Sequence, residues 1–589
     1  MASGKRRRRK PASPVLLAAG VVGILLLAFL VVWAWNKYSM GTDYADLYEY
    51  YSLTDGQVDV YVDMDHVSER GIVKDGEIYL PLESVLKNVD SRYYYDSDSM
   101  IRYVLPEEIV KVSPGASSFK MQGNTVSLQH PAFTVGSSGV YLSLEFMKKL
   151  SRITCESFED PSRLYIFTDF ATEFTKTQSR ADTQVRILAG IKSLILTDLP
   201  NGAEVQVLGE EGKWKKVYYN GCIGYVQTKR LGNDAPFVRE APFDAWEYPG
   251  ISLDGPVRLV WHQIGLVSDN EEIRGEKRLL DGTEGVNVIC PTWFSITDGQ
   301  GNFTSKAQRF YVEEAHKLGM QVWILLDDFD PGFDLYDVLS VNENRDNLIS
   351  KAIRAVKEVN ADGINVDFEY VYEKTGVHFV EFLRELSMAC HENGLILSVD
   401  NYVPVGGRDW VNRKEQGVFV DYYMVMSYDE HYRGSSSAGS VASYNWSKNG
   451  IVDTLEDGVP KEKLVNGIPF YTRVWTETPE SKAEAGATIY ADPNSIYGRY
   501  ALSSYSAGME EAANLLYANN AKKTWLEEER QYYAQYEKNG STVRIWLEEQ
   551  NSLQEKLNLI NEYDIAGVAF WRLGYQDDTV WKVIRETIR

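Results

Sequence analysis

One stretch of the sequence spaces acidic side chains in a way that suits acid–base chemistry. The segment DGINVDFE (residues 362–369) ends an apolar run. Side chains alternate between the two faces of a strand, so Asn365, Asp367 and Glu369 would share one face and the apolar residues between them the other. Two carboxyl groups close together in a poorly solvated place push their pKa values apart, so one can keep its proton near neutral pH. The spacing therefore predicts a general acid, and Glu369 is the candidate.

The runs around this segment predict the fold that would position it. Between residues 256 and 589, apolar runs alternate with helical stretches, and the runs lie at 257–265, 285–294, 320–328, 362–370, 394–402, 420–429, 464–471 and 565–573. Eight such runs separated by helices are typical of a (β/α)8 TIM barrel of the α/β class. Catalytic groups of these barrels stand at the C-terminal strand ends, as Glu369 would. An α+β insertion is expected before the last strand, at about residues 472–545. It would contain two strands joined by a turn at Asn539-Gly540.

Several predicted strand ends resemble glycoside hydrolase family 18, the chitinase-like family. Its signature DxxDxDxE corresponds to residues 362–369, its sixth-strand M-x-Y-D to Met426-Ser-Tyr428-Asp429, and its eighth-strand tryptophan to Trp571. The stretch 428–446 resembles the branch of spore-cortex and cell-wall N-acetylglucosaminidases. The resemblance covers residues 256–589, more than half of the chain.

This resemblance implies retaining, substrate-assisted hydrolysis, for which the sugar must carry a 2-acetamido group as its own nucleophile. Glu369 would protonate the leaving oxygen and later activate water. Asp367 would orient the acetamido group, and Tyr428 would donate a hydrogen bond to its oxygen. The residues expected to bind substrate are Asn365, Met426, Asp429 and Trp571. Neither a cofactor nor a metal site is expected.

The sequence departs from the signature at its middle Asp, where Asn365 stands. A neutral amide cannot share a proton with Asp367 as a carboxyl group would, so the coupled titration must differ. We take this as an argument against a chitinase but not against activity, because Glu369 is kept. The alternative for the whole segment is an ordinary solvated pair of carboxylates. Four tryptophans could line sugar subsites or pack in the core: Trp261, Trp293, Trp323 and Trp446.

The N-terminal residues predict a membrane anchor. A basic run, Lys5–Lys10, precedes an uncharged stretch that ends at Trp35. At about 1.5 Å per residue, a helix over residues 15–35 could cross a hydrocarbon layer of about 30 Å. The basic tail, residues 1–14, would stay in the cytoplasm and the body would lie outside the cell membrane of a Gram-positive bacterium. The apolar stretch is longer than that of a cleaved signal peptide, which is the alternative.

Two further modules are expected between the anchor and the barrel. After a juxtamembrane spacer at 36–57, residues 76–106 resemble residues 138–168. Residues 58–170 are therefore expected to form a duplicated α+β module, similar to the N-terminal repeats of copper amine oxidases. It would serve as a spacer or contact the cell wall.

Residues 183–232 consist of short alternating runs with glycine-rich turns, and they resemble a small bacterial SH3-like β-barrel. Such barrels hold peptidoglycan in many wall hydrolases, although a purely structural barrel would have the same pattern. Residues 233–255 have no period and contain three prolines, which predicts a linker.

Composition limits the remaining possibilities. Of the 589 residues, 44% are hydrophobic and 25% charged, which excludes wholesale disorder and a polytopic membrane protein. The net charge of −23 disfavours nucleic acid as a partner. The expected function is a membrane-anchored hydrolase of glycans that contain N-acetylglucosamine, most simply peptidoglycan or its fragments. The alternatives are a hydrolase of chitin oligosaccharides or N-glycans with the same fold, and a non-catalytic wall-binding protein.

Overall fold

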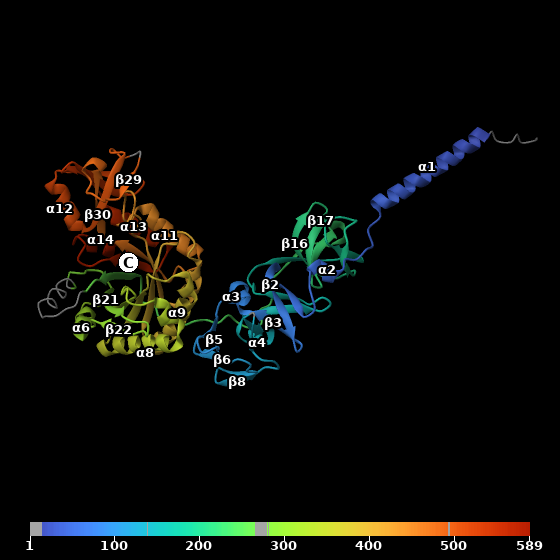
Figure 1. Cartoon of the computed structure of the whole chain (residues 1–589), viewed down its shortest axis with the longest axis horizontal. Helices are drawn as coiled ribbons and strands as arrows, with labels where there is room; N and C mark the ends of the chain where they lie inside the picture. The colour runs from blue at the N-terminus through green and yellow to red at the C-terminus, as the bar shows by residue number, and fades with distance from the viewer. Residues whose placement is uncertain (1–13, 138, 265–279, 281, 493–494, 589) are drawn as a thin grey trace, which may run out of the picture. The chain divides into compact units, whose positions relative to one another are not determined.

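The computed structural model describes residues 14–137, 139–264, 280, 282–492 and 495–588 (Figure 1). Its internal contacts divide the chain into two compact units. The first comprises Met1–Tyr93 and Val112–Ala245, and the second comprises Tyr94–Lys111 and Trp246–Arg589. The basic run of the predicted cytoplasmic tail lies outside the described residues.

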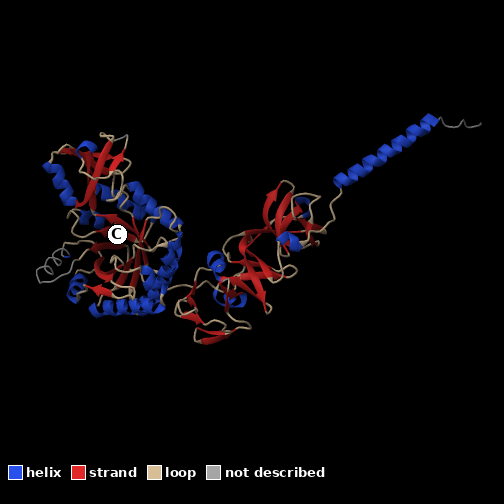
Figure 2. Ribbon diagram, viewed as in Figure 1, coloured by secondary structure: helices blue, strands red, loops and turns tan. Residues whose placement is uncertain are grey.

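The second unit is built on a closed barrel of eight parallel strands ringed by helices, as the sequence predicts (Figure 2). Around the barrel the strands are β20 (Val257–His262), β34 (Gly567–Trp571), β27 (Leu464–Pro469), β26 (Tyr422–Met426), β25 (Ile396–Tyr402), β24 (Gly363–Asp367), β23 (Gln321–Asp327) and β21 (Val288–Ile296). β20 pairs with both β34 and β21, which closes the barrel. A short strand, β22 (Phe303–Ser305), pairs antiparallel with β21.

Helices cover the outside of the barrel strands. They are α6 (Arg309–Lys317), α7 (Leu335–Ser340), α8 (Asn342–Val359), α9 (Glu373–Glu392), α10 (Arg413–Phe419), α11 (Tyr444–Glu456), α13 (Gln550–Tyr563) and α14 (Val580–Thr587). The alternation predicted for β24 is confirmed, because Ile364, Val366 and Phe368 pack in the helix-facing core. Asn365 faces inward, where its amide contacts Trp261 of the inner core.

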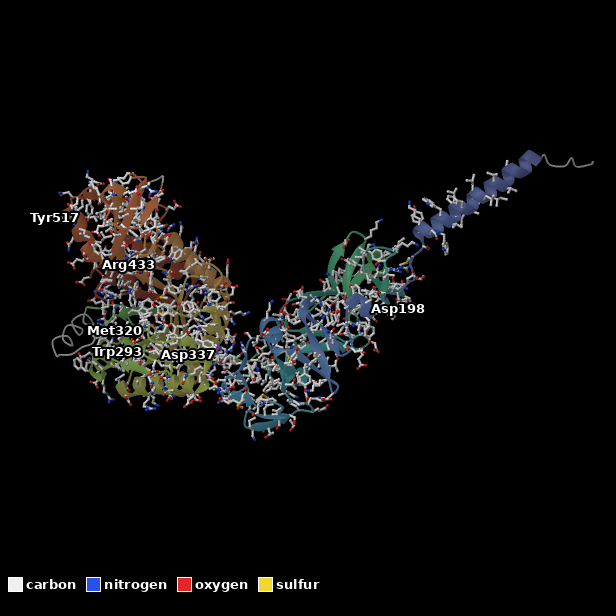
Figure 3. The ribbon with its side chains drawn as sticks, viewed as in Figure 1. Asp198, Trp293, Met320, Asp337, Arg433 and Tyr517 are labelled. Atoms are coloured by element: carbon white, nitrogen blue, oxygen red, sulfur yellow. The ribbon has the colours of Figure 1, made fainter. Side chains whose placement is uncertain are left out.

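Three of the four tryptophans with an open assignment are core residues. Trp261 and Trp323 belong to the inner core of the barrel, and Trp293, labelled in Figure 3, belongs to the helix-facing core. Each of the three is almost fully buried. Trp446 is only partly buried and packs at the edge of the helix-facing core.

The predicted insertion forms a separate sheet before the last barrel strand. Its elements are β28 (Tyr471–Pro479), β29 (Ile489–Ala491), β30 (Arg499–Gly508), α12 (Met509–Ala518), β31 (Lys523–Leu526), β32 (Gln531–Lys538) and β33 (Ser541–Leu547). Asn539 and Gly540 have φ of 55° and 73°, as a two-residue hairpin with two left-handed positions requires. The predicted strand pair, β32 and β33, is thus confirmed, and it belongs to a six-stranded sheet with the order β29-β30-β28-β33-β32-β31.

The first unit contains most of the predicted duplicated module, namely its residues 58–93 and 112–170. Its seven-stranded sheet has the order β11 (Thr154–Phe158), β12 (Arg163–Phe167), β1 (Gln57–Val62), β2 (Asp65–Lys74), β3 (Glu77–Pro81), β10 (Gly139–Ser143) and β9 (Phe133–Gly136). Each copy continues from β3 or β10 into a short helix, α3 (Leu82–Asn88) or α4 (Leu144–Leu150). The first strands of the two copies pair with each other, so the repeats share one sheet.

The two copies differ in the strands that come after the helix. In the second copy, the strand pair β11–β12 joins the shared sheet. In the first copy, β4 (Tyr93–Tyr95) and β5 (Ile101–Val104) form a separate sheet with β6 (Ile109–Val112). Residues 94–111 of this small sheet have their contacts with the barrel unit. A sequence repeat alone does not reveal this difference.

A second sheet of the first unit covers the SH3-like region. Its order is β15 (Ile195–Leu199), β14 (Thr183–Arg186), β18 (Cys222–Gln227), β17 (Trp214–Tyr219), β16 (Glu204–Glu211), β13 (Phe174–Gln178) and β19 (Ala235–Phe237). β19 lies in the predicted linker, and a three-residue strand is too short to show a period. In the predicted spacer, α2 (Leu47–Tyr51) forms a short helix, and Tyr44 bridges to Ile195. Both segments are therefore more ordered than we expected.

The N-terminal helix α1 (Pro14–Tyr38) matches the predicted anchor in length and character. Ala19–Tyr38 is apolar and long enough to cross a membrane, and none of it is buried against the rest of the described protein. A signal sequence would have the same length and composition, so the anchoring role stays a prediction.

Candidate active site

A cavity of about 810 Å³ lies at the C-terminal ends of the barrel strands. Strands β21, β23, β24, β26 and β34 contribute to its wall, together with Tyr471 from the start of the insertion. Of the residues singled out in the sequence, it brings together Asp367, Glu369, Met426, Tyr428, Asp429 and Trp571. Asn365 is not part of its wall. The position of the cavity is the one where barrel enzymes hold their reacting groups.

Glu369 lies two residues beyond β24, on a turn that Asp328 holds in place. The backbone N–H groups of Glu369 and Tyr370 donate to the two carboxylate oxygens of Asp328 at 3.0 and 3.1 Å. At the end of β25, the hydroxyl of Tyr402 donates to Oε2 of Glu369. The main-chain turn and the carboxyl group are therefore each held by a separate strand end.

The surroundings of Glu369 favour its protonated form. Burial raises the pKa of its carboxyl group, the hydrogen bond from Tyr402 lowers it, and the charges of Asp429 and Asp327 raise it again. The net direction is upward, as the sequence predicts. An acid with a raised pKa can still donate its proton near neutral pH.

Asp367, the last residue of β24, is only 5% exposed. Burial raises its pKa well above the ordinary value, and the charges of Asp400, Glu369, Asp328 and Asp327 add to this in that order. Its Oδ1 atom is buried and has no hydrogen-bond partner within the described part of the chain. A buried acceptor on the wall of a cavity is costly unless a ligand completes it. Asp367 thus offers an N–H acceptor to whatever fills the cavity.

Two side chains that come after β26 are oriented by the insertion and by α11. The ring of Tyr428 packs edge-to-face on Tyr471 at 6.4 Å, and its carbonyl oxygen accepts a hydrogen bond from Trp446 Nε1 at 3.3 Å. The hydroxyl of Tyr471 donates to Oδ1 of Asp429 at 2.6 Å. Burial raises the pKa of Tyr428 well above that of free tyrosine, so its hydroxyl remains a donor. Trp446, one of the tryptophans with an open assignment, therefore supports the cavity wall.

Trp571 and Met426 give the cavity its apolar surface. Trp571 ends β34, and its ring lies 6.1 Å from that of Trp261 at an angle of 56°. Met426 ends β26 and is almost completely buried. A partly exposed indole beside an apolar side chain suits the C–H face of a sugar ring.

Asn365 lies below the cavity, among polar side chains of the barrel interior. Its Nδ2 donates to Ser398 Oγ at 2.9 Å and to Asp400 Oδ1 at 2.8 Å, while its Oδ1 accepts from Trp261 Nε1 at 3.1 Å. The geometry therefore gives no support to a direct contact between Asn365 and a bound ligand.

Sequence reasoning missed several residues that shape this site. Asp327 and Asp328 end the third predicted run, and Tyr402 ends the fifth, so their position at strand ends was a usable signal. Tyr471 ends the seventh predicted run and had the same signal, whereas the two cations of the wall, Lys306 and Arg572, end no predicted run. Asp327 is held in place by Ser295, whose hydroxyl donates to it at 2.9 Å.

Comparison with known proteins identifies the domains. Residues 295–577 match the model of glycosyl hydrolases family 18, and residues 182–232 match that of the bacterial SH3 domain. The uncharacterized glycosylase YvbX of Bacillus subtilis is 24% identical over 316 residues, which are 51% of this chain and 84% of the relative. The cortical fragment-lytic enzyme of Bacillus subtilis is 22% identical over 258 residues, which are 41% of this chain and 52% of the relative. This chain thus spans only about half the length of that second relative.

Among solved structures, the spore cortex-lytic enzyme SleL of Bacillus megaterium aligns with a TM-score of 0.48 at 16% identity, over 57% of this chain and 76% of the other. The family match covers the barrel strands from β23 to β34, while β20 lies before it and only the last two residues of β21 fall within it. The chain therefore carries a domain of glycosyl hydrolases family 18 and a bacterial SH3 domain, and it is a glycoside hydrolase.

Proposed function

We propose that this glycoside hydrolase cleaves N-acetylglucosaminyl bonds in peptidoglycan or its fragments, with retention and with the substrate's acetamido group as nucleophile. One observation carries the proposal. The same cavity holds a carboxyl group with a raised pKa, Glu369, and a buried carboxyl oxygen of Asp367 that lacks a partner among the described residues. The first suits a proton donor, and the second suits the N–H of an acetamido group.

In the first step, the acetamido oxygen attacks C1 of the sugar while the bond from C1 to the leaving oxygen breaks. Glu369 gives its proton to that leaving oxygen. Asp367 accepts the acetamido N–H and opposes the positive charge of the cyclic oxazolinium intermediate, and Tyr428 donates to the acetamido oxygen. Glu369 thus transfers the proton and Asp367 orients the acetamido group. Because the acetamido oxygen is the nucleophile, the protein needs none of its own.

In the second step, the ionised Glu369 takes a proton from a water molecule, and the resulting hydroxide attacks C1. The bond from C1 to the acetamido oxygen breaks, which restores the acetamido group. The water attacks C1 from the side on which the leaving oxygen departed in the first step. The configuration at C1 is therefore retained. Trp571 and Met426 would hold the apolar face of the ring during both steps.

Peptidoglycan is favoured over chitin and N-glycans by the rest of the chain. One relative bears the name cortical fragment-lytic enzyme, and its cortical fragments would be pieces of peptidoglycan under this proposal. Bacterial SH3 domains suit a wall-bound hydrolase, and α1 could tether the chain to the membrane with its body outside. A purely wall-binding role is less favoured, because such a role does not need the proton donor Glu369.

The test is hydrolysis by the purified chain of peptidoglycan, chitin oligosaccharides and an N-glycosylated protein. Mass analysis of borohydride-reduced products identifies the sugar at each new reducing end. We expect N-acetylglucosamine ends from peptidoglycan. Muramic acid ends, or faster release from chitin, would contradict the assigned substrate.

Glu369→Gln tests the acid directly. Because the amide cannot donate a carboxyl proton, we expect turnover to fall by about 10²- to 10⁴-fold with the melting temperature unchanged. Glu373→Gln is the matched control, because Glu373 is exposed at the start of α9 and outside the cavity wall. Equal rates for Glu369→Gln and wild type would refute the catalytic role.

A further inference from the structure

Because Asn365 is an amide, it cannot share a proton with Asp367. The neighbouring strand β25 carries a carboxyl group that can. Strands β24 and β25 pair in parallel, with Asn365 opposite Ser398 and Val366 opposite Val399. Continuing this register by one residue sets Asp400 beside Asp367. On the other side of β24, Asp327 is opposite Asp367. Three carboxyl groups therefore form a row across β23, β24 and β25.

Such a row cannot be fully ionised. Neighbouring strands lie about 4.8 Å apart, and two charges at that distance repel by about 3 kcal/mol even at an effective dielectric constant of about 20. Asp400 is 3% exposed, and burial raises its pKa to about 8. The pKa of Asp367 is raised by burial and, next in size, by the charge of Asp400. At neutral pH the two carboxyl groups must retain at least one proton between them.

The groups around this pair are mostly acidic or neutral. Those that interact with Asp367 or Asp400, or line a small hollow with Asp400, are Asp327 and Asp328 of the β23 end, Glu369 after β24, Tyr402 of β25, Tyr428 after β26, Cys290 of β21, and Arg408 and Arg413 after β25. Among the described residues, no ion pair joins either arginine to Asp367 or Asp400. The proton is therefore the counter-ion of the pair.

Asn365 is suited to orient Asp400. Its Nδ2 donates to Asp400 Oδ1, and its own Oδ1 is occupied by Trp261 Nε1, so the amide is locked with its donor toward Asp400. We propose that Asp400 supplies, from β25, the proton-sharing carboxyl group that the family signature places at residue 365, and that Asn365 acts as its positioning residue.

The inference rests on the proposed function and adds one step to it. When the acetamido N–H reaches Asp367, the shared proton passes to Asp400, so Asp367 becomes an anion and Asp400 a neutral acid. The total charge of the pair does not change. Asp367 then faces the positive oxazolinium as an anion, without a second buried negative charge beside it. Asp400 acts through Asp367 and does not touch the substrate.

Asp400→Asn tests this, with Ser398→Ala as matched control. Ser398→Ala removes one acceptor of the Asn365 amide, whereas Asp400→Asn keeps a side-chain oxygen as acceptor and removes the titratable group. We expect Asp400→Asn to lower kcat by about tenfold or more and to change the pH profile of kcat. Ser398→Ala should leave the shape of that profile unchanged. An unchanged profile for Asp400→Asn would overturn the proposal.

The exchange Asn365→Asp/Asp400→Asn separates the titration from mere packing. It moves the carboxyl group to the place given by the signature and keeps a hydrogen bond between the two positions. We expect it to recover most of the activity lost in Asp400→Asn and to restore the pH profile. If the double variant is as slow as Asp400→Asn, residue 400 has only a structural role and the proposal fails.

An infrared readout distinguishes this proposal from the proposed function. At neutral pH, the C=O band of a protonated carboxyl group should be weaker in Asp400→Asn than in wild type and should return in the double variant. This comparison needs no substrate. A chain without activity on any glycan but with this band pattern would refute the function and keep the shared proton. If the chain is active and the three proteins have identical bands, the proposed function is kept and the shared proton is refuted.

Discussion

The pKa of the Glu369 carboxyl group is raised by some of its neighbours and lowered by another. Their balance sets the pH at which the group loses its proton. Burial and the charges of Asp429 and Asp327 disfavour the ionised form, while the hydroxyl of Tyr402 favours it. A general acid must be protonated in the first step and ionised in the second. A partial counterweight such as Tyr402 therefore suits a group that has to do both.

Tyr402→Phe removes this counterweight. Without the hydrogen bond that favours the carboxylate, the pKa of Glu369 should rise, so the acid keeps its proton to higher pH. We expect the alkaline limb of kcat/KM against pH to move to higher pH. Tyr402 is 38% exposed, so the substitution leaves no large cavity. Tyr370→Phe, an exposed tyrosine next to Glu369, should leave the limb in place, and a shift of Tyr402→Phe to lower pH would contradict the argument.

At this scale, the sequence predicted the residues that end strands within a motif, such as Glu369, Asp367 and Tyr428. It did not predict those that act on them from neighbouring strands. Asp328 binds the turn through backbone N–H groups, which leave no mark on side-chain spacing. Asp400 meets Asp367 only through the register of β24 and β25, which a single run of residues does not contain.

At the scale of elements, a buried ion network joins residues 94–111 to the barrel helices. Arg102 donates to Asp96 Oδ2 at 2.6 Å and to Glu385 Oε1 at 2.8 Å. Arg345 of α8 donates to the other oxygen of Glu385 at 2.6 Å. All four side chains are buried. The charges satisfy one another, so the loss of one leaves the others unpaired in a dry place.

Arg102→Ala should therefore destabilise the barrel unit by about 3–5 kcal/mol, as expected when one partner of a buried ion pair is removed. The measurement is the unfolding of the full chain by urea or heat. The free energy of unfolding is taken from the transition in which activity is lost, because that transition reports on the barrel unit. Arg499→Ala is the control, because Arg499 pairs with Glu480 on the exposed surface of the insertion and should leave this transition unchanged. If both variants unfold like wild type, the network does not hold residues 94–111 in place.

The eight barrel strands and the hairpin at Asn539-Gly540 could be predicted, because they depend on local patterns of apolar residues and turns. The role of residues 94–111 could not. Arg102 lies in one repeat and Glu385 is 283 positions away on α9, where it resembles an ordinary charge of an amphipathic helix. Pairing across that distance is decided by packing, and packing is not periodic in the sequence.

At the scale of the whole molecule, the parts follow one another along the chain as an apolar helix, two small modules and a barrel, and the proposed tether depends on the first of them. The family matches confirm the barrel and the SH3 domain. The anchor depends only on the length and composition of α1, which a retained anchor and a cleaved signal have in common. A retained anchor and a cleaved signal give mature chains with different N-termini. Cell fractionation and N-terminal sequencing therefore distinguish them.

Deletion of residues 1–38 should release the chain from the membrane without loss of chemistry. The cut spares Gly41, whose N–H donates to Ile191 O at 2.7 Å and whose carbonyl oxygen accepts from Arg186 at 2.8 Å, so the first unit keeps its contacts. We expect the full chain to sediment with membranes and the shortened chain to stay soluble. Both should have equal kcat on a soluble muropeptide, because every residue of the cavity wall lies in the barrel unit.

The full chain is the control, and its own N-terminus decides between the two possibilities. If the membrane-bound protein begins at its original N-terminus, α1 is retained, and the loss of sedimentation on deletion results from about 20 apolar residues leaving the bilayer. A full chain that accumulates in the medium, beginning after residue 35, would instead show that a signal sequence is removed. In that case the proposed attachment to the wall would depend on the SH3 domain and the predicted duplicated module, without a membrane tether.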